Sequence, residues 1–276
     1  MKQIITGLIC VAAAVCAGCN SLFYYPSDKV YNETIDVLHE EGFIDSSSGN
    51  KLNYYYFPAE NPKGIILYFH GNSRNINAHY KAFLWAVPQG YDLLLADYSG
   101  YGKSTGKAER EAINADAIAM LAFAADKKAQ HGYKLVAVGQ SLGGAVMLGG
   151  VGSFDERGQV DLMVADCTFK SYIDIGKDTV GRYCLPIGWF RWGVNDNCAP
   201  WKTFEKIKDI PIIVSHCRED ATVPFEFGED LFSSLQNKEK YFVELSCKHT
   251  AGYWKEPNQK SLLAMFDAIL FGKKQQ

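Results

Sequence analysis

Several features that mark other protein classes are scarce in this sequence of 276 residues. Lysine and arginine number 28 against 31 acidic residues, which gives a net charge of −3, and the basic residues form no cluster. We therefore expect no nucleic-acid partner, because nucleic-acid-binding proteins carry a basic patch. The composition, 47% hydrophobic and 21% charged, also excludes an intrinsically disordered chain.

Long hydrophobic runs are also missing, apart from residues 4–17 near the start. This run is shorter than the ~20 residues of a membrane-spanning helix and is typical of a signal peptide. The Cys-Ala-Gly-Cys of residues 16–19 resembles a bacterial lipobox, although its first position is usually Leu, Val or Ile. We expect residues 1–18 to be a lipoprotein signal peptide and Cys19 to carry a lipid, which anchors the protein in the bacterial cell envelope. The alternative is an ordinary cleaved signal.

Metal and nucleotide motifs are absent from the chain beyond residue 19. The five cysteines there show no C-x-x-C spacing, so no zinc site is expected. Residues 97–104 end in Gly-Lys-Ser like a phosphate-binding loop, but Asp97 occupies the place of the first glycine. The sequence therefore predicts neither a metal nor a cofactor.

Strand-like and helix-like segments alternate from about residue 64 to the end. This order predicts an α/β fold with a mostly parallel, doubly wound sheet, in a single domain over residues 19–276. We expect strands at 34–44, 51–57, 64–70, 91–96, 134–138, 160–165, 211–215 and 240–245, and helices at 78–87, 108–130, 142–148, 225–235 and 258–270. In such sheets the ligand site lies beyond the carboxyl ends of the strands.

One segment, residues 169–203, interrupts the alternation, and we expect it to form a short cap insertion over the sheet edge. It is rich in aromatic side chains, namely Trp189, Phe190, Trp192 and Trp201. These rings either line a site for the acyl or aromatic part of a substrate or simply pack the core of the cap.

A serine elbow is the strongest chemical signal. The G-x-S-x-G pattern occurs twice, around Ser104 and around Ser141. The elbow needs a strand directly before the serine and a helix directly after it, so that the hydroxyl stands exposed on a sharp turn. Only Ser141 has both neighbours, whereas Ser104 lies in a loop. We therefore interpret Ser141 as the nucleophile and Ser104 as a turn residue.

A serine nucleophile needs a base and a carboxylate that holds the base. After an elbow the expected order is Ser, then Asp or Glu, then His. His249 follows the last predicted strand and is the expected base, while His216 is interpreted as structural. Asp220 is the expected acid, with Glu219 and Asp166 as rivals.

Two backbone N–H groups are needed to bind the oxyanion of the tetrahedral intermediate. The first is expected from Leu142, the residue after the nucleophile. The second is expected from Asn72, because Gly71 allows the backbone to turn sharply after the first buried strand. His70 is interpreted as a support for this loop.

Together these motifs resemble the α/β-hydrolase superfamily, in its Bem46-like and serine-aminopeptidase-like branch, which includes monoacylglycerol lipases. The resemblance runs in order from about residue 30 to 271. It implies a Ser-Asp-His hydrolase without a cofactor that acts on esters or related acyl bonds. The motifs are His70-Gly-Asn72, Asp97-Tyr-Ser-Gly-Tyr-Gly-Lys-Ser104, Gly139-Gln-Ser-Leu-Gly-Gly144, Asp220 with Val223-Pro224, and His249.

Two positions depart from the family pattern, which usually has glycine where this chain has Cys217 and Lys248. Cys217 and Cys247 end neighbouring predicted strands just before the acid and the base. They form either a disulfide that ties the two loops or two thiols packed in the sheet. Cys184 and Cys198 flank the cap and form a second possible pair.

The expected substrate is a small acyl ester, thioester or peptide-like compound met in the cell envelope. One alternative is an aminopeptidase, for which acidic residues of the cap, Asp174, Asp178 and Asp196, would hold the substrate amine. Another is an inactive hydrolase fold that serves as a membrane-anchored binding lipoprotein. The complete set of three catalytic residue types argues against the inactive form.

Overall fold

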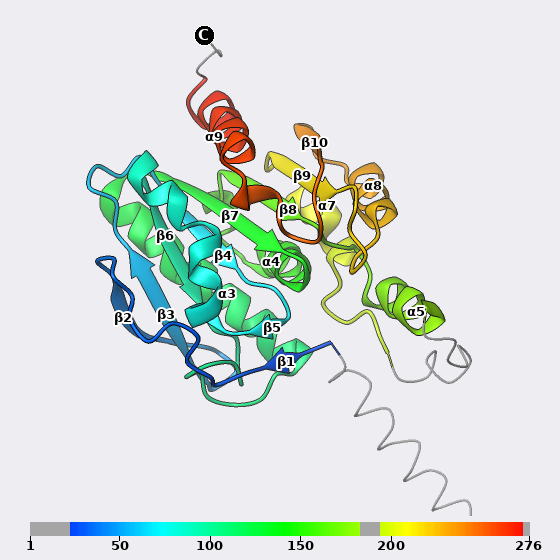
Figure 1. The fold of residues 1–276 in the computed structure, drawn as a ribbon, viewed down its shortest axis with the longest axis horizontal. Coiled ribbons are helices and arrows are strands. Elements are labelled where there is room, and N and C mark those ends of the chain that lie inside the picture. Colours follow the sequence, from blue (N-terminus) through cyan, green and yellow to red (C-terminus); the bar gives the residue numbers. More distant parts are fainter. Residues whose placement is uncertain (1–22, 183–193, 273–276) are drawn as a thin grey trace, which may run out of the picture.

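The computed structural model describes residues 23–182 and 194–272 of the chain. Its centre is an eight-stranded sheet of order β10-β9-β8-β7-β4-β6-β3-β2 (Figure 1). β3 runs antiparallel to its neighbours β2 and β6, and the other neighbouring strands are parallel. The strands are β2 (Glu40–Asp45), β3 (Lys51–Phe57), β4 (Gly64–Phe69), β6 (Tyr91–Ala96), β7 (Lys134–Gln140), β8 (Leu162–Asp166), β9 (Ile212–Cys217) and β10 (Lys240–Leu245).

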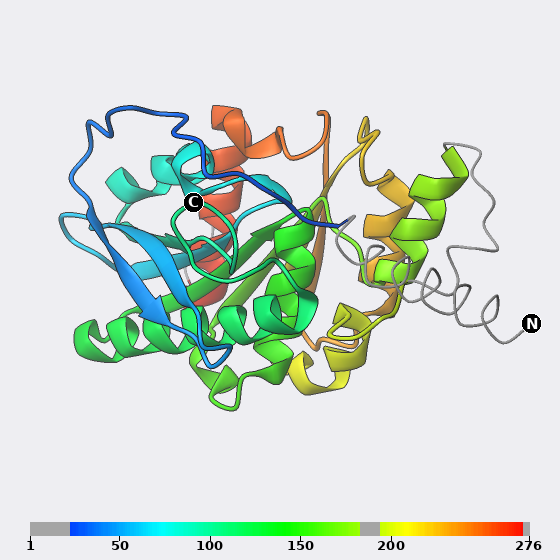
Figure 2. The same ribbon diagram turned by 90° about the horizontal axis from the view of Figure 1, so that it is seen from below.

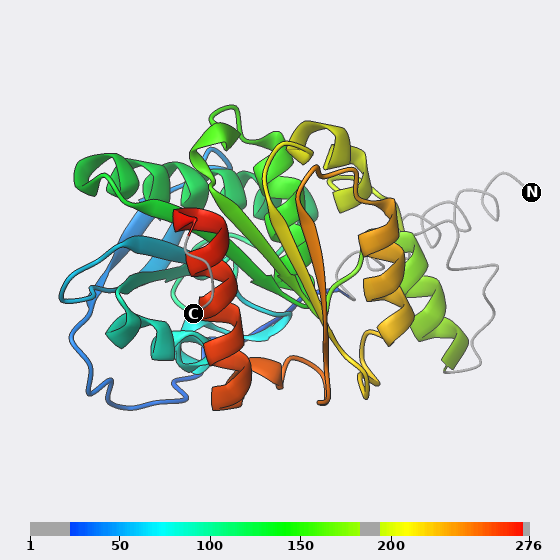
Figure 3. The same ribbon diagram turned by 90° about the horizontal axis from the view of Figure 1, so that it is seen from above.

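The sheet has a hydrophobic core on each face, and β4 shows why. Its six residues are all buried, as in a parallel strand covered on both sides. Ile65, Leu67 and Phe69 join one core, which α3, α4 and α8 cover. Ile66 and Tyr68 join the other core, which α9 covers (Figure 3). The helices are α3 (Arg110–His131), α4 (Leu142–Ser153), α8 (Phe225–Ser234) and α9 (Glu256–Phe271).

The predicted fold class is confirmed, but two predicted elements differ from the structure. The strand expected over 34–44 begins only at Glu40. The helix expected over 78–87 is broken into α2 (Ile76–His79) and the 3₁₀ turns η1 (Tyr80–Ala82) and η2 (Leu84–Gln89). Pro88 lies inside η2, where it has no N–H to donate and its ring disfavours a regular α-turn.

An N-terminal strap, residues 23–39, runs along the outside of the molecule to the end of the sheet where β2 begins (Figure 2). Near its start, β1 (Tyr25–Pro26) pairs in parallel with β5 (Ser73–Arg74). Three asparagine side chains that follow β4 form hydrogen bonds with the backbone of the strap. These contacts are Asn72 to Tyr25, Asn75 to Ser27 and Asn77 to Tyr31.

The predicted cap contains α5 (Tyr172–Arg182) and the 3₁₀ turn η4 (Pro200–Thr203), which α7 (Phe204–Ile207) follows. Trp189, Phe190 and Trp192 lie outside the described residues, as do the predicted signal peptide and Cys19. Trp201 is about half exposed and donates its indole N–H to Asp196. In the described residues, none of the helices combines the length and the apolar character required to span a bilayer.

Candidate active site

Ser141 stands on a sharp turn between β7 and α4 and has φ 55° and ψ −125°. A non-glycine residue pays for this conformation in strain, of the order of 1–3 kcal/mol. The surrounding glycines make the turn possible. A Cβ on Gly143 would collide with the carbonyl oxygen of Phe69, and one on Gly144 would come within 2.6 Å of Cβ of Thr168. The predicted elbow is therefore present.

Two backbone contacts fix the strained serine. The N–H of Ser141 donates to the carbonyl of Asp166 at 2.9 Å. The hydroxyl of Thr168 donates to the carbonyl of Ser141 at 2.6 Å. These contacts come from the end of β8 and from the loop after it. The strand next to β7 in the sheet therefore holds the elbow in place.

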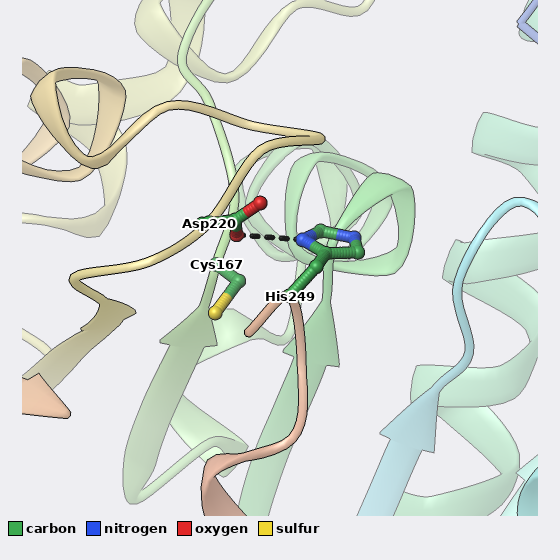
Figure 4. A group of neighbouring side chains, drawn as sticks. All are labelled: Cys167, Asp220 and His249. Atoms are coloured by element: carbon green, nitrogen blue, oxygen red, sulfur yellow. Dashed lines mark hydrogen bonds and ion pairs between the residues drawn. The ribbon is translucent and has the colours of Figure 1, made fainter. Parts of the chain in front are cut away.

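The structure brings Ser141, His249 and Asp220 together in the predicted order. Nε2 of His249 lies 2.9 Å from Oγ of Ser141. Nδ1 of His249 lies 2.6 Å from Oδ2 of Asp220, as Figure 4 shows. His249 stands on the loop after β10 and Asp220 on the loop after β9, so parallel neighbouring strands deliver both side chains to the same edge of the sheet.

Asp220 is held as a carboxylate. Burial by itself raises the pKa of Asp220. The hydrogen bond and charge of His249, together with the N–H groups of Val223 and Thr222, lower this pKa by more than burial raises it. The resulting pKa lies below the ordinary value of an aspartate. The two N–H groups donate to Oδ1, so Oδ2 is left to accept from the imidazole.

The rival residues have other partners. Asp166 is fully buried and accepts hydrogen bonds from Ser215 and Gln140, and burial raises its pKa. Glu219 is exposed. The hydroxyl of Ser104 donates to the carbonyl of Asp97, which fits its interpretation as a turn residue.

His216 is buried next to the loop that carries Asp220. Its Nε2–H donates to the carbonyl of Val223 at 2.9 Å, and Nε2 is 3.6 Å from Oδ2 of Asp220. A Cβ on Gly228 of α8 would collide with the ring, which shows how closely the helix packs on it. The predicted structural role of His216 is therefore supported.

The loop between β4 and α2 lies beside the nucleophile. A Cβ on Gly71 would be 3.7 Å from Cβ of Ser141. The carbonyl of Asn72 accepts from Tyr101 at 2.7 Å and its Oδ1 accepts from the N–H of Tyr25. These bonds engage the two oxygen atoms of Asn72 and do not involve its N–H. Leu142 is the first residue of α4, and helices do not use their first N–H groups internally.

A pair of buried side chains supports this loop, and sequence reasoning identified only one of them. The ring of His70 donates from Nδ1 to the carbonyl of Gly71, and its Nε2 is 3.5 Å from Oδ1 of Asp97. Burial lowers the pKa of His70 to about 3 and raises that of Asp97 to about 8. Tyr98 stacks on the imidazole, with ring centroids 4.3 Å apart, and donates to the carbonyl of His70.

One set of potential metal ligands exists in the described part of the chain. Cys167, Asp220 and His249 place three donor atoms within 4.8 Å of one another (Figure 4). However, the hydrogen bond between His249 and Asp220 already occupies Nδ1 and Oδ2. Burial also strongly raises the pKa of the Cys167 thiol, and metals bind the thiolate. The group fits a proton-transfer site better than a metal centre.

The cysteine hypotheses have different outcomes. Cys217 and Cys247 form a disulfide with their Cα atoms 5.0 Å apart. The pairing of Cys198 with Cys184 is not found, because Cys198 has a free thiol, and Cys184 lies outside the described residues. The cap is therefore not fixed to its flank by this second bridge.

Two of the three acidic residues expected to hold a substrate amine, Asp174 and Asp196, are engaged with other residues. Asp196 accepts from the hydroxyl of Ser171, from the N–H of Ile173 and from Trp201. Asp174 pairs with Lys177 on the same helix. Both carboxylates thus have structural partners within the cap and its flanks.

Comparison with known proteins agrees with this geometry. A family model described as serine aminopeptidase, S33, matches residues 60–169. The uncharacterized protein YfhR of Escherichia coli K12 is 27% identical over 81% of this chain and 77% of its own length. The bem46 protein of Schizosaccharomyces pombe is 26% identical over 71% of this chain and 66% of its own. The lysophosphatidylserine lipase ABHD12 of Danio rerio is 26% identical over 88% of this chain and 68% of its own.

Solved structures share the same fold. The esterase Pf2001 of Pyrococcus furiosus has a TM-score of 0.70 at 17% identity and covers 90% of this chain and 98% of its own. Brefeldin A esterase has a TM-score of 0.65 at 16% identity and covers 96% of this chain and 85% of its own. The chain therefore has the α/β-hydrolase fold and is similar to proteins of the Bem46-like branch of that superfamily.

Proposed function

We propose that this protein is a serine hydrolase that cleaves carboxylic esters or related acyl bonds. The observation that carries the proposal is the continuous hydrogen-bonded chain from Ser141 Oγ through His249 to Asp220, with distances of 2.9 and 2.6 Å. In this arrangement His249 can take a proton from the serine, and Asp220 can stabilise the positive charge that results. Its place on a strained elbow exposes the hydroxyl to a substrate.

The proposed reaction has two halves. Oγ of Ser141 attacks the acyl carbon while Nε2 of His249 takes the hydroxyl proton, and Asp220 stabilises the imidazolium. The N–H groups of Asn72 and Leu142 bind the oxyanion, and His249 then protonates the leaving alcohol. A water molecule, activated by the same imidazole, releases the acyl group from Ser141.

The substrate class follows from the relatives and from the site. The similarity to a lysophosphatidylserine lipase favours an acyl ester of a polar alcohol, and the similarity to esterases extends this to simple esters and thioesters. The aminopeptidase alternative is weaker, because Asp196 and Asp174 are engaged elsewhere. The binding-protein alternative is weaker because the three side chains are assembled.

We further propose that the protein acts in the bacterial cell envelope as a single-domain lipoprotein, residues 19–276. The support is the lipobox-like sequence around Cys19 and the apolar run before it. A disulfide next to the candidate site agrees with an oxidising compartment.

A fluorophosphonate probe tests the proposed nucleophile. We expect the mature wild type and Ser104→Ala to be labelled and Ser141→Ala to be unlabelled, because the hydroxyl of Ser141 lies 2.9 Å from an imidazole, whereas that of Ser104 bonds to a backbone carbonyl. Ser104→Ala is the matched control, since it removes the same hydroxyl from the second G-x-S-x-G segment. Esters of graded acyl length then define the substrate. Persistent labelling of Ser141→Ala, or none of the folded wild type, contradicts the proposal.

A further inference from the structure

We propose that the Cys217–Cys247 disulfide positions the catalytic residues, so that its reduction lowers turnover in a protein that stays folded. This inference rests on the proposed serine hydrolase function and assigns a redox dependence to the same site. The pairing is unlike the family pattern, which usually has glycine at position 217.

The disulfide joins the starts of the two loops that carry Asp220 and His249. Cys217 is the last residue of β9, three positions before Asp220. Cys247 follows the end of β10 and stands two positions before His249. Because each cysteine is this close to one of the two residues, a displacement at the sulfur atoms moves Nδ1 of His249 relative to Oδ2 of Asp220.

Few other contacts hold the base loop against the acid loop. β10 is an edge strand whose residues are mostly half-buried or exposed, and its partner in the sheet is β9. At the exposed surface the guanidinium of Arg218 pairs with the carboxylate of Glu244 in β10. Beyond the strands, the N–H of Arg218 donates to Leu245 and that of Glu219 donates to Cys247. Both bonds involve residues next to the bridge. Without the disulfide, the His249 loop depends on these bonds and on the weakly packed edge.

The sulfur atoms are shielded, which makes the bridge persistent. Cys217 is completely buried and Cys247 is 5% exposed. A third sulfur, Cys167, follows the neighbouring strand β8, but burial strongly raises the pKa of its thiol. Exchange needs a thiolate, so Cys167 does not open the bridge at neutral pH. An external dithiol does so: it gives two electrons and two protons to the sulfurs, and becomes a disulfide itself.

The expected effect is on the chemical step. The bridge joins the segments that carry Asp220 and His249 and does not include the elbow that carries Ser141, so substrate affinity should change little. A shift of about 1 Å in a catalytic group costs about 100-fold in rate. We therefore expect kcat to fall by about 10- to 100-fold, with KM changed by less than about threefold.

The experiment compares oxidised wild type, dithiothreitol-treated wild type, and the double variant Cys217→Ser with Cys247→Ser, using a short-chain ester. Cys198→Ser is the matched control, because it removes a free and partly buried thiol. Circular dichroism at the assay temperature shows whether each form is folded. The rate of fluorophosphonate labelling and the pH profile of kcat report on the His249 pair directly.

We expect slow turnover and slow labelling for reduced wild type and the double variant, recovery of the wild type on reoxidation, and no effect of reductant on the double variant. A folded double variant, or folded reduced wild type, with kcat within twofold of oxidised wild type overturns the inference. So does loss of activity that follows loss of the dichroism signal. Failure of the proposed function looks different, because then oxidised wild type itself is not labelled.

Discussion

Individual buried side chains set the geometry of the loop after β4, which carries the proposed oxyanion donor Asn72. His70 and Asp97 are both almost inaccessible, and neither is expected to be charged at neutral pH, because burial lowers one pKa to about 3 and raises the other to about 8. Nε2 of His70 lies 3.5 Å from Oδ1 of Asp97, which accepts the N–H of Ile76. The loop that carries Asn72 thus rests on a neutral pair.

The two members of this pair act on stability in opposite directions. The lowered pKa of His70 makes stability rise with pH up to about 6.5, whereas the raised pKa of Asp97 makes it fall. The pKa of Asp97 is about 8 in the folded protein and about 4 when unfolded. Between these values the folded state binds one more proton, so the free energy of unfolding falls by up to about 1.4 kcal/mol per pH unit as pH rises. We expect Asp97→Asn to lose this slope, measured by urea unfolding from pH 6.5 to pH 8, above the range in which the shift of His70 acts. Parallel curves for both proteins would contradict the assignment.

At the residue scale the sequence predicted which side chains meet, but not what supports them. Ser141, Asp220 and His249 follow from a motif and from chain order, and the structure places them within hydrogen-bonding distance. The support from Thr168 and Tyr98 was missed. Both make contacts between segments far apart in the chain, and hydroxyl groups of this kind carry no local pattern. The repeated tyrosines of the segment after β6 were the available signal for Tyr98.

Among the elements, α4 has the tightest constraints. It begins directly after the nucleophile, and its glycines allow the backbone to approach β4 and the loop after β8. On helix propensity alone, alanine at such positions would stabilise the helix by about 1 kcal/mol. The space around the glycines decides against this, because the neighbouring atoms lie closer than any real Cβ contact.

We therefore expect Gly144→Ala to reduce the free energy of unfolding by about 1–3 kcal/mol, through overpacking against Thr168. Activity should fall as well, since Thr168 holds the carbonyl of Ser141. Urea unfolding and ester hydrolysis measure the two effects. Gly158→Ala is the control, because a Cβ there meets no atom within 4 Å. Equal stability of both variants would contradict the steric argument.

Several elements were well predicted along their whole length. β10 matches its predicted bounds, and α3 and α9 differ from theirs by one or two residues at each end. The helix predicted over 78–87 was wrong, because this segment forms the short turns α2, η1 and η2, and Pro88 lies only in the last of them. The first half of the segment 34–44 pairs with no strand, since it belongs to the strap that passes outside the sheet.

At the scale of the whole molecule, the proposed lipid on Cys19 would attach the protein to a membrane of the cell envelope. If Cys19 is lipidated, Cys19→Ala should move the protein from the membrane fraction to the soluble fraction, because each buried lipid CH₂ contributes about 0.8 kcal/mol. Fractionation and the mass of the mature N-terminus measure this, with Cys198→Ala as the control. Hydrolysis of a soluble ester should be unchanged in both variants. A wild type without the added lipid mass contradicts the proposed anchor.

The strap has a practical consequence for anyone who shortens this chain. The N–H of Tyr25 bonds to the side chain of Asn72, whose own N–H is the proposed oxyanion donor. A protein that starts after β1, or a protease that cuts within residues 23–27, removes this contact and the β1–β5 pairing together. Such a product would keep every catalytic side chain and still hydrolyse poorly, and an inactive fragment of this kind would be easily mistaken for evidence that the enzyme has no activity at all.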